Sequence, residues 1–345
     1  MEGAKPSAAS AKEKVRIGIN GFGRIGRNFF RLLLDHKNLE VVVINDLAPA
    51  PTLTHLLKYD SIHGVLKKEI SSTSNSLLID GKEVSILNHF MPQEINWNQY
   101  QVDVVVESTG KFKTRKDLEP HLQRGVKKVI LSVPPQDDSI KMVVLGVNED
   151  ILDGTEDIIS NASCTTNNAA PMLRIVDELA GVKQAYITTI HSYTTDQSLH
   201  DQPHKDLRRA RAAGQSIVPT TTGAAKALTK IFPDLSEVIG GCGIRVPVAN
   251  GSLTDMTLHV KRKTTIEEIN VAFKNAASGP LKNIIEYTED PIVSIDIKGN
   301  PHSCIFDAQM TSVVGGNFVK IIGWYDNEIG YSSRLIDLIS HVSIK

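Results

Sequence analysis

The stretch from Val15 to Asp46 constrains the fold more than any other part of this 345-residue chain. A short β-branched run, VRIGIN, is followed by GFGRIG and then by RNFFRLLLDH, whose apolar spacing predicts a helix. A second apolar run, LEVVVIND, ends on Asp46, about 20 residues beyond the last glycine of the turn. This order of strand, glycine-rich turn, helix and acidic strand end is the fingerprint of a dinucleotide-binding βαβ unit.

The fingerprint assigns a task to each of its residues. Gly21, Gly23 and Gly26 allow a tight turn and let the backbone approach a pyrophosphate at the helix N-terminus. Asp46 is expected to accept hydrogen bonds from the adenosine ribose hydroxyls. Its charge would repel a 2′-phosphate, so the pattern predicts NAD rather than NADP as the cofactor.

The remaining apolar runs of the first half indicate a parallel sheet. Residues 102–109, 129–133 and 142–147 are nearly continuous in Val, Ile and Leu, and helix-length segments separate them. Such strands are typical of a sheet covered by helices on both faces. We therefore expect an α/β, doubly wound (Rossmann) domain over residues 15–163. Residues 1–14 lack the apolar block of a signal peptide and are expected to form a disordered tail.

The second half has a different pattern. TTNNAAPMLRIVDELAG has helical spacing, and QAYITTIHSY is a strand candidate that contains His191. GSLTDMTLHVKRK and GNFVKIIGWYDN are longer strand candidates, and YSSRLIDLISHV at the end of the chain is helical. We expect an α+β catalytic domain with a mostly antiparallel sheet over residues 164–328.

Composition excludes several classes of protein. Lys plus Arg number 38 and Asp plus Glu 39, a balance that argues against dedicated nucleic-acid binding. No apolar run reaches the roughly 18 residues of a membrane span. Three widely spaced cysteines do not suggest a disulfide framework, so a reducing, cytoplasmic location is expected. The sequence has neither HExxH nor CxxC, and we predict no metal site.

One cysteine stands in a polar setting. In SNASCTTNN, Cys164 precedes a predicted helix, whose N-terminal dipoles are expected to lower the thiol pKa. His191 follows at the end of the next strand, where the two ends can converge at one edge of a sheet. A histidine beside a thiol can favour the thiolate and move protons. Spacing alone does not decide whether Cys164 and His191 form a catalytic pair, because most cysteines are inert.

Basic and hydroxyl-rich segments suggest anion binding. DLRRARAAG belongs to a long polar loop, residues 196–216. It is either a solvated basic surface or a segment whose arginines order this loop or lie near anionic ligand groups. VPTTTGAAKAL places Thr222 and Gly223 at the start of a helix, where hydroxyl and N–H groups suit a phosphate. Arg245, in GIRVP, is a candidate point contact for a phosphate ester.

Taken together, these motifs resemble the phosphorylating glyceraldehyde-3-phosphate dehydrogenases. The resemblance extends from Val15 to Lys345 and rests on NGFGRIGR, ESTG, SNASCTTN, HSYTTDQ, DLRRARAA, TTTGAAKA, IRVP and WYDNEIGYS, in that order. It implies oxidation of glyceraldehyde 3-phosphate with NAD and inorganic phosphate, in glycolysis or gluconeogenesis. Cys164 would form a hemithioacetal and then a thioester, and His191 would act as the base. The family also implies a homotetramer.

The resemblance assigns further positions. It implies that the C-terminal helix, 329–345, packs back on the first domain. It also implies that Asp196 helps to orient Arg245. The substrate phosphate would contact Thr194, Asp196 and Arg245, and the attacking phosphate would contact Ser163, Thr165, Thr222 and Gly223. The cofactor would lie along Arg24 and Ile25, with further contacts from Ser132 and, at the nicotinamide carboxamide, from Asn327.

Alternative functions remain open. An erythrose-4-phosphate dehydrogenase would share the thiol and the histidine, although TTTGAAKA favours phosphate over water as the attacking group. A non-catalytic protein that binds nucleotides or RNA would not need Cys164, His191 and Arg245 together. Gln202 stands before Pro203, where NAD-specific relatives tend to have an apolar residue, so some use of NADP also remains open.

Overall fold

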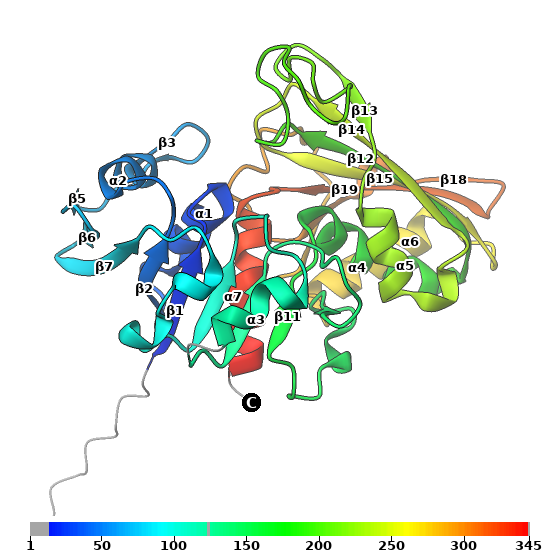
Figure 1. Cartoon of the computed structure of the whole chain (residues 1–345). Coiled ribbons are helices and arrows are strands. Elements are labelled where there is room, and N and C mark those ends of the chain that lie inside the picture. The colour runs from blue at the N-terminus through cyan, green and yellow to red at the C-terminus, as the bar shows by residue number, and fades with distance from the viewer. Residues whose placement is uncertain (1–13, 123–124, 344–345) are drawn as a thin grey trace, which may run out of the picture.

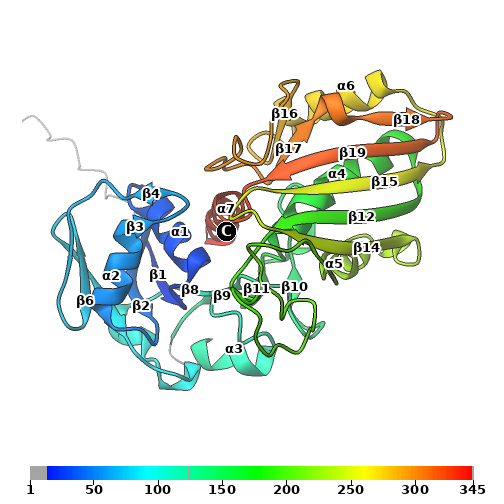
Figure 2. The same ribbon diagram turned by 90° about the horizontal axis from the view of Figure 1, so that it is seen from above.

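A computed structural model describes residues 14–122 and 125–343 (Figure 1). All of the expected N-terminal tail except Lys14 lies outside the described residues. The described chain forms two large sheets with helices packed against them, and the C-terminal helix lies between the two halves in both Figure 1 and Figure 2.

The first sheet has the strand order β10-β11-β9-β8-β1-β2-β7-β6-β5. In this spatial order, all neighbouring strands from β10 through β7 are parallel. Strands β6 and β5 extend the sheet beyond β7 in antiparallel orientation. The strands are β1 (Val15–Asn20), β2 (Leu39–Asn45), β5 (Ile70–Ser72), β6 (Ser76–Ile79), β7 (Lys82–Leu87), β8 (Val104–Glu107), β9 (Lys128–Leu131), β10 (Lys141–Met142) and β11 (Ile158–Ser160).

Alternate residues of these strands are buried on opposite faces. Val104 and Val106 belong to a core shared with α1 (Arg24–Leu33) and α7 (Ile329–Ser343), whereas Val105 belongs to a second core that contains Leu118 of α3 (Arg115–Leu122). Both faces are thus covered, which explains the uninterrupted apolar runs. The predicted doubly wound fold is confirmed.

One predicted strand is wrong over most of its length. Of the apolar run 142–147, only Met142 belongs to a strand. The rest turns at Val144, whose N–H donates to Asn148 Oδ1 at 2.8 Å, and Gly146 has φ +79°. The run is apolar because Val143 is buried in the core of the first sheet and Val144 in that of the second.

The second sheet has the order β13-β14-β12-β15-β19-β17-β16, and β18 also pairs with β19. Five of its pairs are antiparallel, and only β12–β14 and β16–β17 are parallel, so the predicted mostly antiparallel sheet is confirmed. The strands are β12 (Val182–Ser192), β13 (Val218–Thr220), β14 (Ile239–Val246), β15 (Ser252–Val260), β16 (Ile285–Thr288), β17 (Cys304–Asp307), β18 (Ser312–Val314) and β19 (Phe318–Tyr325).

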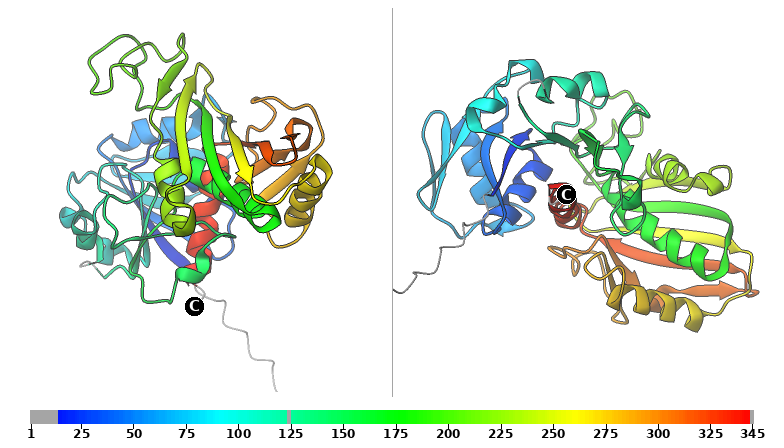
Figure 3. Two further views of the ribbon diagram at one scale, coloured as in Figure 1. Left: turned by 90° about the vertical axis from the view of Figure 1, so that its right-hand side faces the viewer. Right: turned by 90° about the horizontal axis from the view of Figure 1, so that it is seen from below.

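The α-helices between residues 164 and 278 lie on one face of this sheet (Figures 1 and 3). The α-helices of the described chain are α1 (Arg24–Leu33), α2 (Ala50–Lys58), α3 (Arg115–Leu122), α4 (Cys164–Ala180), α5 (Ala224–Ile231), α6 (Ile266–Ser278) and α7 (Ile329–Ser343). Short 3-10 turns occupy Pro92–Glu94, Trp97–Tyr100, Glu149–Ile151, Pro233–Leu235 and Ala308–Met310, and a small hairpin joins β3 (Tyr59–Asp60) to β4 (Gly64–Val65).

Helix α7 contributes to the core of the first half. Leu335, Leu338 and Ile339 are buried in the same cluster as Phe29 and Leu33 of α1. The chain therefore leaves the second sheet at β19 and runs directly into a helix that packs on the first sheet. This path brings the β19–α7 turn between the two halves.

Candidate active site

The carboxyl ends of β1, β2 and β8 form the wall of a cavity of about 270 Å³. Gly21, Gly23 and Asp46 line it, as the sequence fingerprint predicts for a dinucleotide groove. Ligands of doubly wound sheets bind at this carboxyl edge. Other lining residues were not predicted. They lie at strand ends or within five residues after them, and they include Asn20, Asn45, His89, Phe90, Thr109 and Phe112.

The three glycines of the turn have different surroundings. Gly21 has φ +95°, and a Cβ there would lie 2.6 Å from the backbone nitrogen of Thr109. A Cβ on Gly26 would lie 2.3 Å from the carbonyl oxygen of Gly21. At Gly23, by contrast, no atom lies within 4 Å of the Cβ position. Gly21 and Gly26 thus close the turn, and the open space at Gly23, before α1, fits the pyrophosphate of a dinucleotide.

Asp46 fastens the glycine-rich turn. Its Oδ2 accepts a hydrogen bond from the N–H of Phe22 at 2.7 Å, and its Oδ1 accepts one from the N–H of Ala48 at 2.9 Å. The carboxylate remains half-buried at the cavity wall. It can therefore accept hydrogen bonds from a ribose while it also stabilises the turn.

A buried polar chain lies behind this wall, and the sequence did not reveal it. Glu107 is fully buried and accepts hydrogen bonds from Asn20 Nδ2 at 2.6 Å and from the N–H of Thr109 at 2.9 Å. His121 Nε2 lies 3.4 Å from the same carboxylate, and Trp97 Nε1 donates to His121 Nδ1 at 2.9 Å. The chain fixes Asn20 and Thr109 where they face the cavity.

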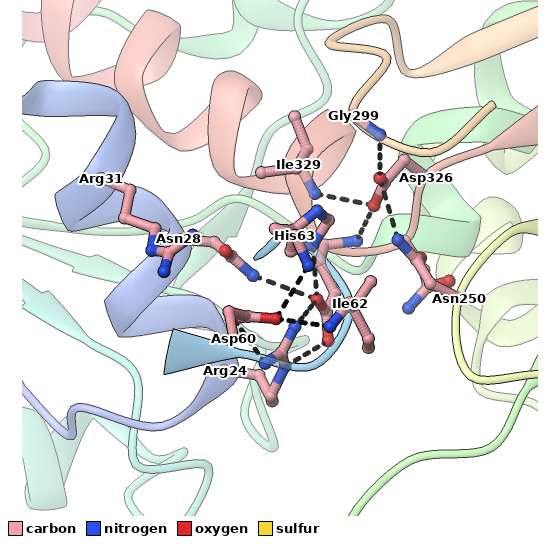
Figure 4. A network of polar contacts seen from close by, with 12 residues as sticks. Arg24, Asn28, Arg31, Asp60, Ile62, His63, Asn250, Gly299, Asp326 and Ile329 are labelled. Atoms are coloured by element: carbon pink, nitrogen blue, oxygen red, sulfur yellow. Dashed lines mark hydrogen bonds and ion pairs between the residues drawn. The ribbon is translucent and has the colours of Figure 1, made fainter. Parts of the chain in front are cut away.

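Arg24 differs from its expected position along the cofactor. Its guanidinium makes a 2.6 Å ion pair with Asp60 (Figure 4). It also makes a two-pronged ion pair with Glu328, which His63 contacts as well. Burial alone would raise the pKa of Asp60, but the hydrogen bond from Arg24 and two backbone N–H groups hold that pKa at about 2. Ile25 packs on the core of the first sheet. Both side chains are thus engaged elsewhere, so only the backbone groups of Arg24 and Ile25 can contact a cofactor in the groove.

Asn327 lies in the β19–α7 turn and is nearly buried. Its Oδ1 accepts hydrogen bonds from Ser192 Oγ at 2.9 Å, Ser252 Oγ at 3.0 Å and the N–H of Gly251 at 3.3 Å. Because the backbone N–H can only donate, this atom is the oxygen. The amide NH₂ has no partner among the described residues, so it is free to donate to a carboxamide.

Ser132 does not reach the cavity wall. It is buried directly after β9, and its N–H donates to the carbonyl of Glu107 at 3.0 Å. The structure gives no further support for its predicted cofactor contact.

Cys164 and His191 meet in space. Cys164 is the first residue of α4, and its Sγ lies 3.5 Å from Nε2 of His191, at the end of β12. Ser163 is the N-cap, because its Oγ accepts a hydrogen bond from the N–H of Thr166 at 3.1 Å. The cap fixes the start of the helix and so fixes the thiol opposite the imidazole.

Nδ1 of His191 has two polar neighbours. It is 2.7 Å from the carbonyl oxygen of Ser192 and 2.8 Å from Arg245 Nη1. The carbonyl only accepts and the guanidinium only donates, so the first contact suits a proton on Nδ1 and the second a lone pair there. The guanidinium also donates to Ser192 O, at 3.0 Å. With the proton on Nδ1, Nε2 has a lone pair and can take the proton of Cys164.

Burial controls the charges of this pair. It lowers the pKa of His191 to about 3, and the positive charge of Arg245 adds to the shift. It also raises the pKa of the Cys164 thiol, although the charge of Arg245 and hydrogen bonds at Thr165 oppose this. The expectation of a lowered thiol pKa from the helix N-terminus is therefore wrong in direction, because desolvation outweighs the dipoles. Proton transfer from the thiol to Nε2 would form the thiolate and the imidazolium together.

Tyr325 was missed by sequence reasoning. Its ring stands edge-on to that of His191, with centroids 5.9 Å apart, and its hydroxyl lies 2.9 Å from the hydroxyls of both Thr165 and Thr189. The Thr165 side chain is therefore buried and hydrogen-bonded to Tyr325, and its contact with the attacking phosphate stays a prediction. The one sequence signal for Tyr325 was its place next to the tryptophan in the motif WYDN.

Arg245 and Asp196 do not form the expected pair. Arg245 stands opposite His191 in the parallel register of β12 and β14. The ion-pair partner of Asp196 is Arg209, which also donates to Thr220 Oγ1 at 3.0 Å. Asp196 is exposed and acts on Arg245 only through its charge. The arginine-rich segment thus orders the long loop, one of the two interpretations that its sequence left open.

The remaining phosphate candidates lie at the start of α5 and on the loop after β12. Thr222 Oγ1 accepts a hydrogen bond from the N–H of Ala224 at 3.2 Å, so its own hydroxyl hydrogen remains available. Gly223 is exposed, with open space at its Cβ position. Thr194 is half-buried, and its carbonyl accepts from the N–H of Gln197 at 2.9 Å.

Two kinds of feature are absent from the described part of the chain. No helix there has the length and apolar character needed to cross a membrane. No group of three or more His, Cys, Asp or Glu side chains gathers there as metal ligands would.

Comparison with known families decides the relationship. Residues 15–115 match the model of the glyceraldehyde 3-phosphate dehydrogenase NAD-binding domain, and residues 163–327 match that of the C-terminal domain. The chain belongs to the glyceraldehyde-3-phosphate dehydrogenase family. It is an NAD-dependent oxidoreductase of that family, as the sequence motifs predict.

Individual relatives match over nearly their whole length. Glyceraldehyde-3-phosphate dehydrogenase 2 of Streptomyces avermitilis is 52% identical over 326 residues, which cover 94% of this chain and 97% of the relative. Glyceraldehyde-3-phosphate dehydrogenase 1 of Bacillus cereus is 51% identical, with 96% and 99% covered. The Geobacillus stearothermophilus enzyme is 49% identical, again with 96% and 99% covered.

Proposed function

We propose that this protein oxidises D-glyceraldehyde 3-phosphate to 1,3-bisphosphoglycerate with NAD and inorganic phosphate, and that Cys164 and His191 perform the chemistry. The observation that carries the proposal is the 3.5 Å contact between the Cys164 thiol and His191 Nε2, next to Arg245. A nucleophile, a base and a cation thus converge between a dinucleotide groove and a catalytic sheet. The family relationship supports the same substrate.

His191 transfers a proton in each of the first two steps. Its Nε2 takes the thiol proton while Cys164 Sγ attacks the aldehyde carbon, and the imidazolium returns that proton to the carbonyl oxygen, so that a neutral hemithioacetal forms. His191 next accepts the hydroxyl proton of the hemithioacetal as its hydride leaves, and a thioester on Cys164 remains. Phosphate attacks the thioester carbon and releases the acyl phosphate and the Cys164 thiolate. Sulfur suits this sequence because a thioester transfers its acyl group more readily than an oxygen ester.

NAD, when bound, supplies the hydride acceptor. We assign its pyrophosphate to the turn at Gly23 and the free N–H groups of Arg24 and Ile25, its adenosine ribose to Asp46, and its carboxamide to the NH₂ of Asn327. The open space at Gly23 and the unpaired NH₂ support this assignment. A contact between Ser132 and the cofactor is proposed only because the family resemblance implies it.

Two anion positions are proposed. Arg245 would contact the substrate phosphate, with Thr194 nearby on the loop, and Asp196 would act indirectly through Arg209. Thr222 and Gly223 would hold the attacking phosphate at the start of α5, where the hydroxyl hydrogen is available. Ser163 would assist as the N-cap of α4, whereas Thr165 would contribute through its hydrogen bond to Tyr325.

Formation of NADH from glyceraldehyde 3-phosphate, measured with and without inorganic phosphate, tests the proposal. Steady turnover should require phosphate, because only phosphorolysis regenerates Cys164. Turnover that is independent of phosphate, and faster with erythrose 4-phosphate, would favour the erythrose-4-phosphate alternative. Binding of NAD without any NADH formation would favour the non-catalytic alternative.

Asp46 should set the preference for NAD over NADP. Asp46→Ala removes both the charge that repels a 2′-phosphate and the bond to the N–H of Phe22. We expect the ratio of kcat/KM for NAD to that for NADP to fall by roughly 10- to 100-fold, the effect of one nearby charge. Asp46→Asn is the matched control, because it removes the charge but keeps an acceptor for Phe22. Similar use of both cofactors by the unmodified protein would contradict this role.

Arg245 and Thr222 should affect different phosphates. Arg245→Leu should raise KM for glyceraldehyde 3-phosphate by about 10- to 100-fold, and much less for unphosphorylated glyceraldehyde, because a charged hydrogen bond is lost. Thr222→Ala should raise KM for inorganic phosphate by about 2- to 10-fold. Steady-state kinetics with each substrate varied in turn distinguishes them. Equal effects of both variants on both substrates would show that the two positions are not separate.

We also propose a cytoplasmic homotetramer built from an NAD-binding domain (15–163, with 329–345) and a catalytic domain (164–328). The exposed apolar side chains of the long loop support assembly: Leu199, Leu207 and Ile217 are 73%, 81% and 69% exposed. Three free thiols are consistent with a reducing location. Light scattering should give the mass of four chains, and Leu207→Asp should reduce it; a monomer at micromolar concentration would contradict the proposal.

A further inference from the structure

The loop that leads to Cys164 contains a residue with an unfavourable backbone conformation. Ala162 has φ +54°, in the left-handed region, and it is fully buried. A residue with a Cβ atom populates this region less than the right-handed helical region by roughly 5- to 30-fold. The surrounding structure must therefore hold Ala162 in this conformation.

Hydrogen bonds hold the loop on both sides of Ala162. Its N–H donates to Ser160 Oγ at 3.1 Å. Asn167, one turn into α4, donates from Nδ2 to the carbonyl oxygens of Asn161 at 2.8 Å and Ser163 at 3.1 Å. These bonds tie the loop to the strand before it and to the helix after it.

The carbonyl of Ala162 is held from a distant part of the chain. Tyr331 is buried in the first turn of α7, and its hydroxyl donates to Ala162 O at 3.1 Å. Helix α7 is held by a core that it shares with α1 and the first sheet, through Leu335, Leu338 and Ile339. The hydroxyl therefore has a fixed anchor from which to constrain Ala162.

We propose that the Tyr331 hydroxyl is a positioning group for Cys164, and that it acts by holding Ala162 in the left-handed conformation. Cys164 is the first residue of α4, so the direction of its side chain depends on the backbone of Ala162 and Ser163. Relaxation of Ala162 to negative φ turns the thiol away from Nε2 of His191, now 3.5 Å distant. This inference rests on the proposed role of Cys164.

Tyr331→Phe tests the proposal by removing only the hydroxyl. We expect kcat to fall by about 2- to 10-fold, the effect of one net hydrogen bond, while KM for the aldehyde and for NAD stays within about twofold. The rate of Cys164 alkylation by iodoacetamide should fall by the same factor. Tyr287→Phe is the matched control, because its hydroxyl bonds only to the exposed Glu289, and it should leave both rates unchanged. Alkylation of Tyr331→Phe at the unmodified rate would overturn the proposal.

Glycine at position 162 provides a rescue experiment. Glycine adopts positive φ without penalty, so Ala162→Gly alone should keep kcat within about twofold and should not lower the thermal unfolding temperature. In the double variant with Tyr331→Phe, kcat and the alkylation rate should return to within about twofold of Ala162→Gly. A double variant as slow as Tyr331→Phe would show that the hydroxyl acts elsewhere.

The alkylation measurements separate this inference from the proposed function. They report the position and ionisation of Cys164 without any substrate or cofactor. Absence of dehydrogenase activity in the unmodified protein would contradict the proposed function, yet the pattern across the three variants would still test the constraint on Ala162. A Tyr331→Phe protein that alkylates slowly and is rescued by Ala162→Gly confirms it.

Discussion

Replacing Cys164 with serine should abolish dehydrogenase activity, with a loss of at least roughly four orders of magnitude in kcat. A serine hydroxyl at the same place is far less ionised than a thiol and yields an ester, which phosphate cleaves poorly. Binding of NAD should survive, because Cys164 does not line the cavity at the carboxyl ends of β1, β2 and β8. Initial rates of NADH formation and fluorescence titration with NAD measure the two properties separately.

Two further cysteines provide matched controls for this result. Cys242 is half-buried on β14 and Cys304 is fully buried on β17, and neither contacts His191. Cys242→Ser should keep nearly full activity. Residual turnover of Cys164→Ser above about one per cent would mean that the thiol is not the nucleophile.

Replacing His191 with asparagine should lower kcat by roughly two to four orders of magnitude, the usual contribution of a positioned general base. His191 is an efficient acceptor because its low pKa, about 3, keeps Nε2 unprotonated at neutral pH. Without it, the Cys164 thiolate loses the imidazolium that forms on proton transfer, so the thiol pKa should rise further. The pH profile of iodoacetamide alkylation should therefore shift to higher pH.

The shift in the alkylation profile separates a base from a purely structural residue. His191→Gln is a second variant with an amide at nearly the same distance from the thiol, and it should behave like His191→Asn because neither amide accepts a proton. His63→Asn changes a histidine of the Arg24–Glu328 network instead, and it should leave the profile in place. An alkylation profile unchanged by His191→Asn would show that the imidazole does not control the thiol.

Local sequence patterns were sufficient for the groove because its parts are close in the chain. The turn from Gly21 to Gly26 forms directly between β1 and α1, and Gly21 and Gly26 are each required there by close backbone contacts. The alternation of Val104, Val105 and Val106 between two cores likewise follows from strand geometry. The same reasoning misread residues 142–147, because burial between two cores and burial in a sheet give the same apolar run.

Long-range contacts were not accessible in this way. Asp196 pairs with Arg209 rather than serving Arg245, and Arg24 is committed to Glu328, 304 residues away. The hydrogen bonds of Tyr325 likewise depend on the packing of β19 against α4 and β12. A charged or hydroxyl side chain has many possible partners in the sequence, and only the folded structure shows which of them lies within reach.

The sequence by itself determined the two-sheet architecture, the cofactor fingerprint and the identities of the thiol and the histidine, because these depend on periodicity and on residue chemistry. Only the tertiary structure decided how these groups meet. The 3.5 Å approach of Cys164 Sγ to His191 Nε2 and the contact of Arg245 with His191 Nδ1 depend on the packing of α4, β12 and β14, which are separated in the chain. Desolvation in that packing raises the pKa of the thiol and lowers that of the imidazole, a balance that the helix dipole predicted from sequence does not contain.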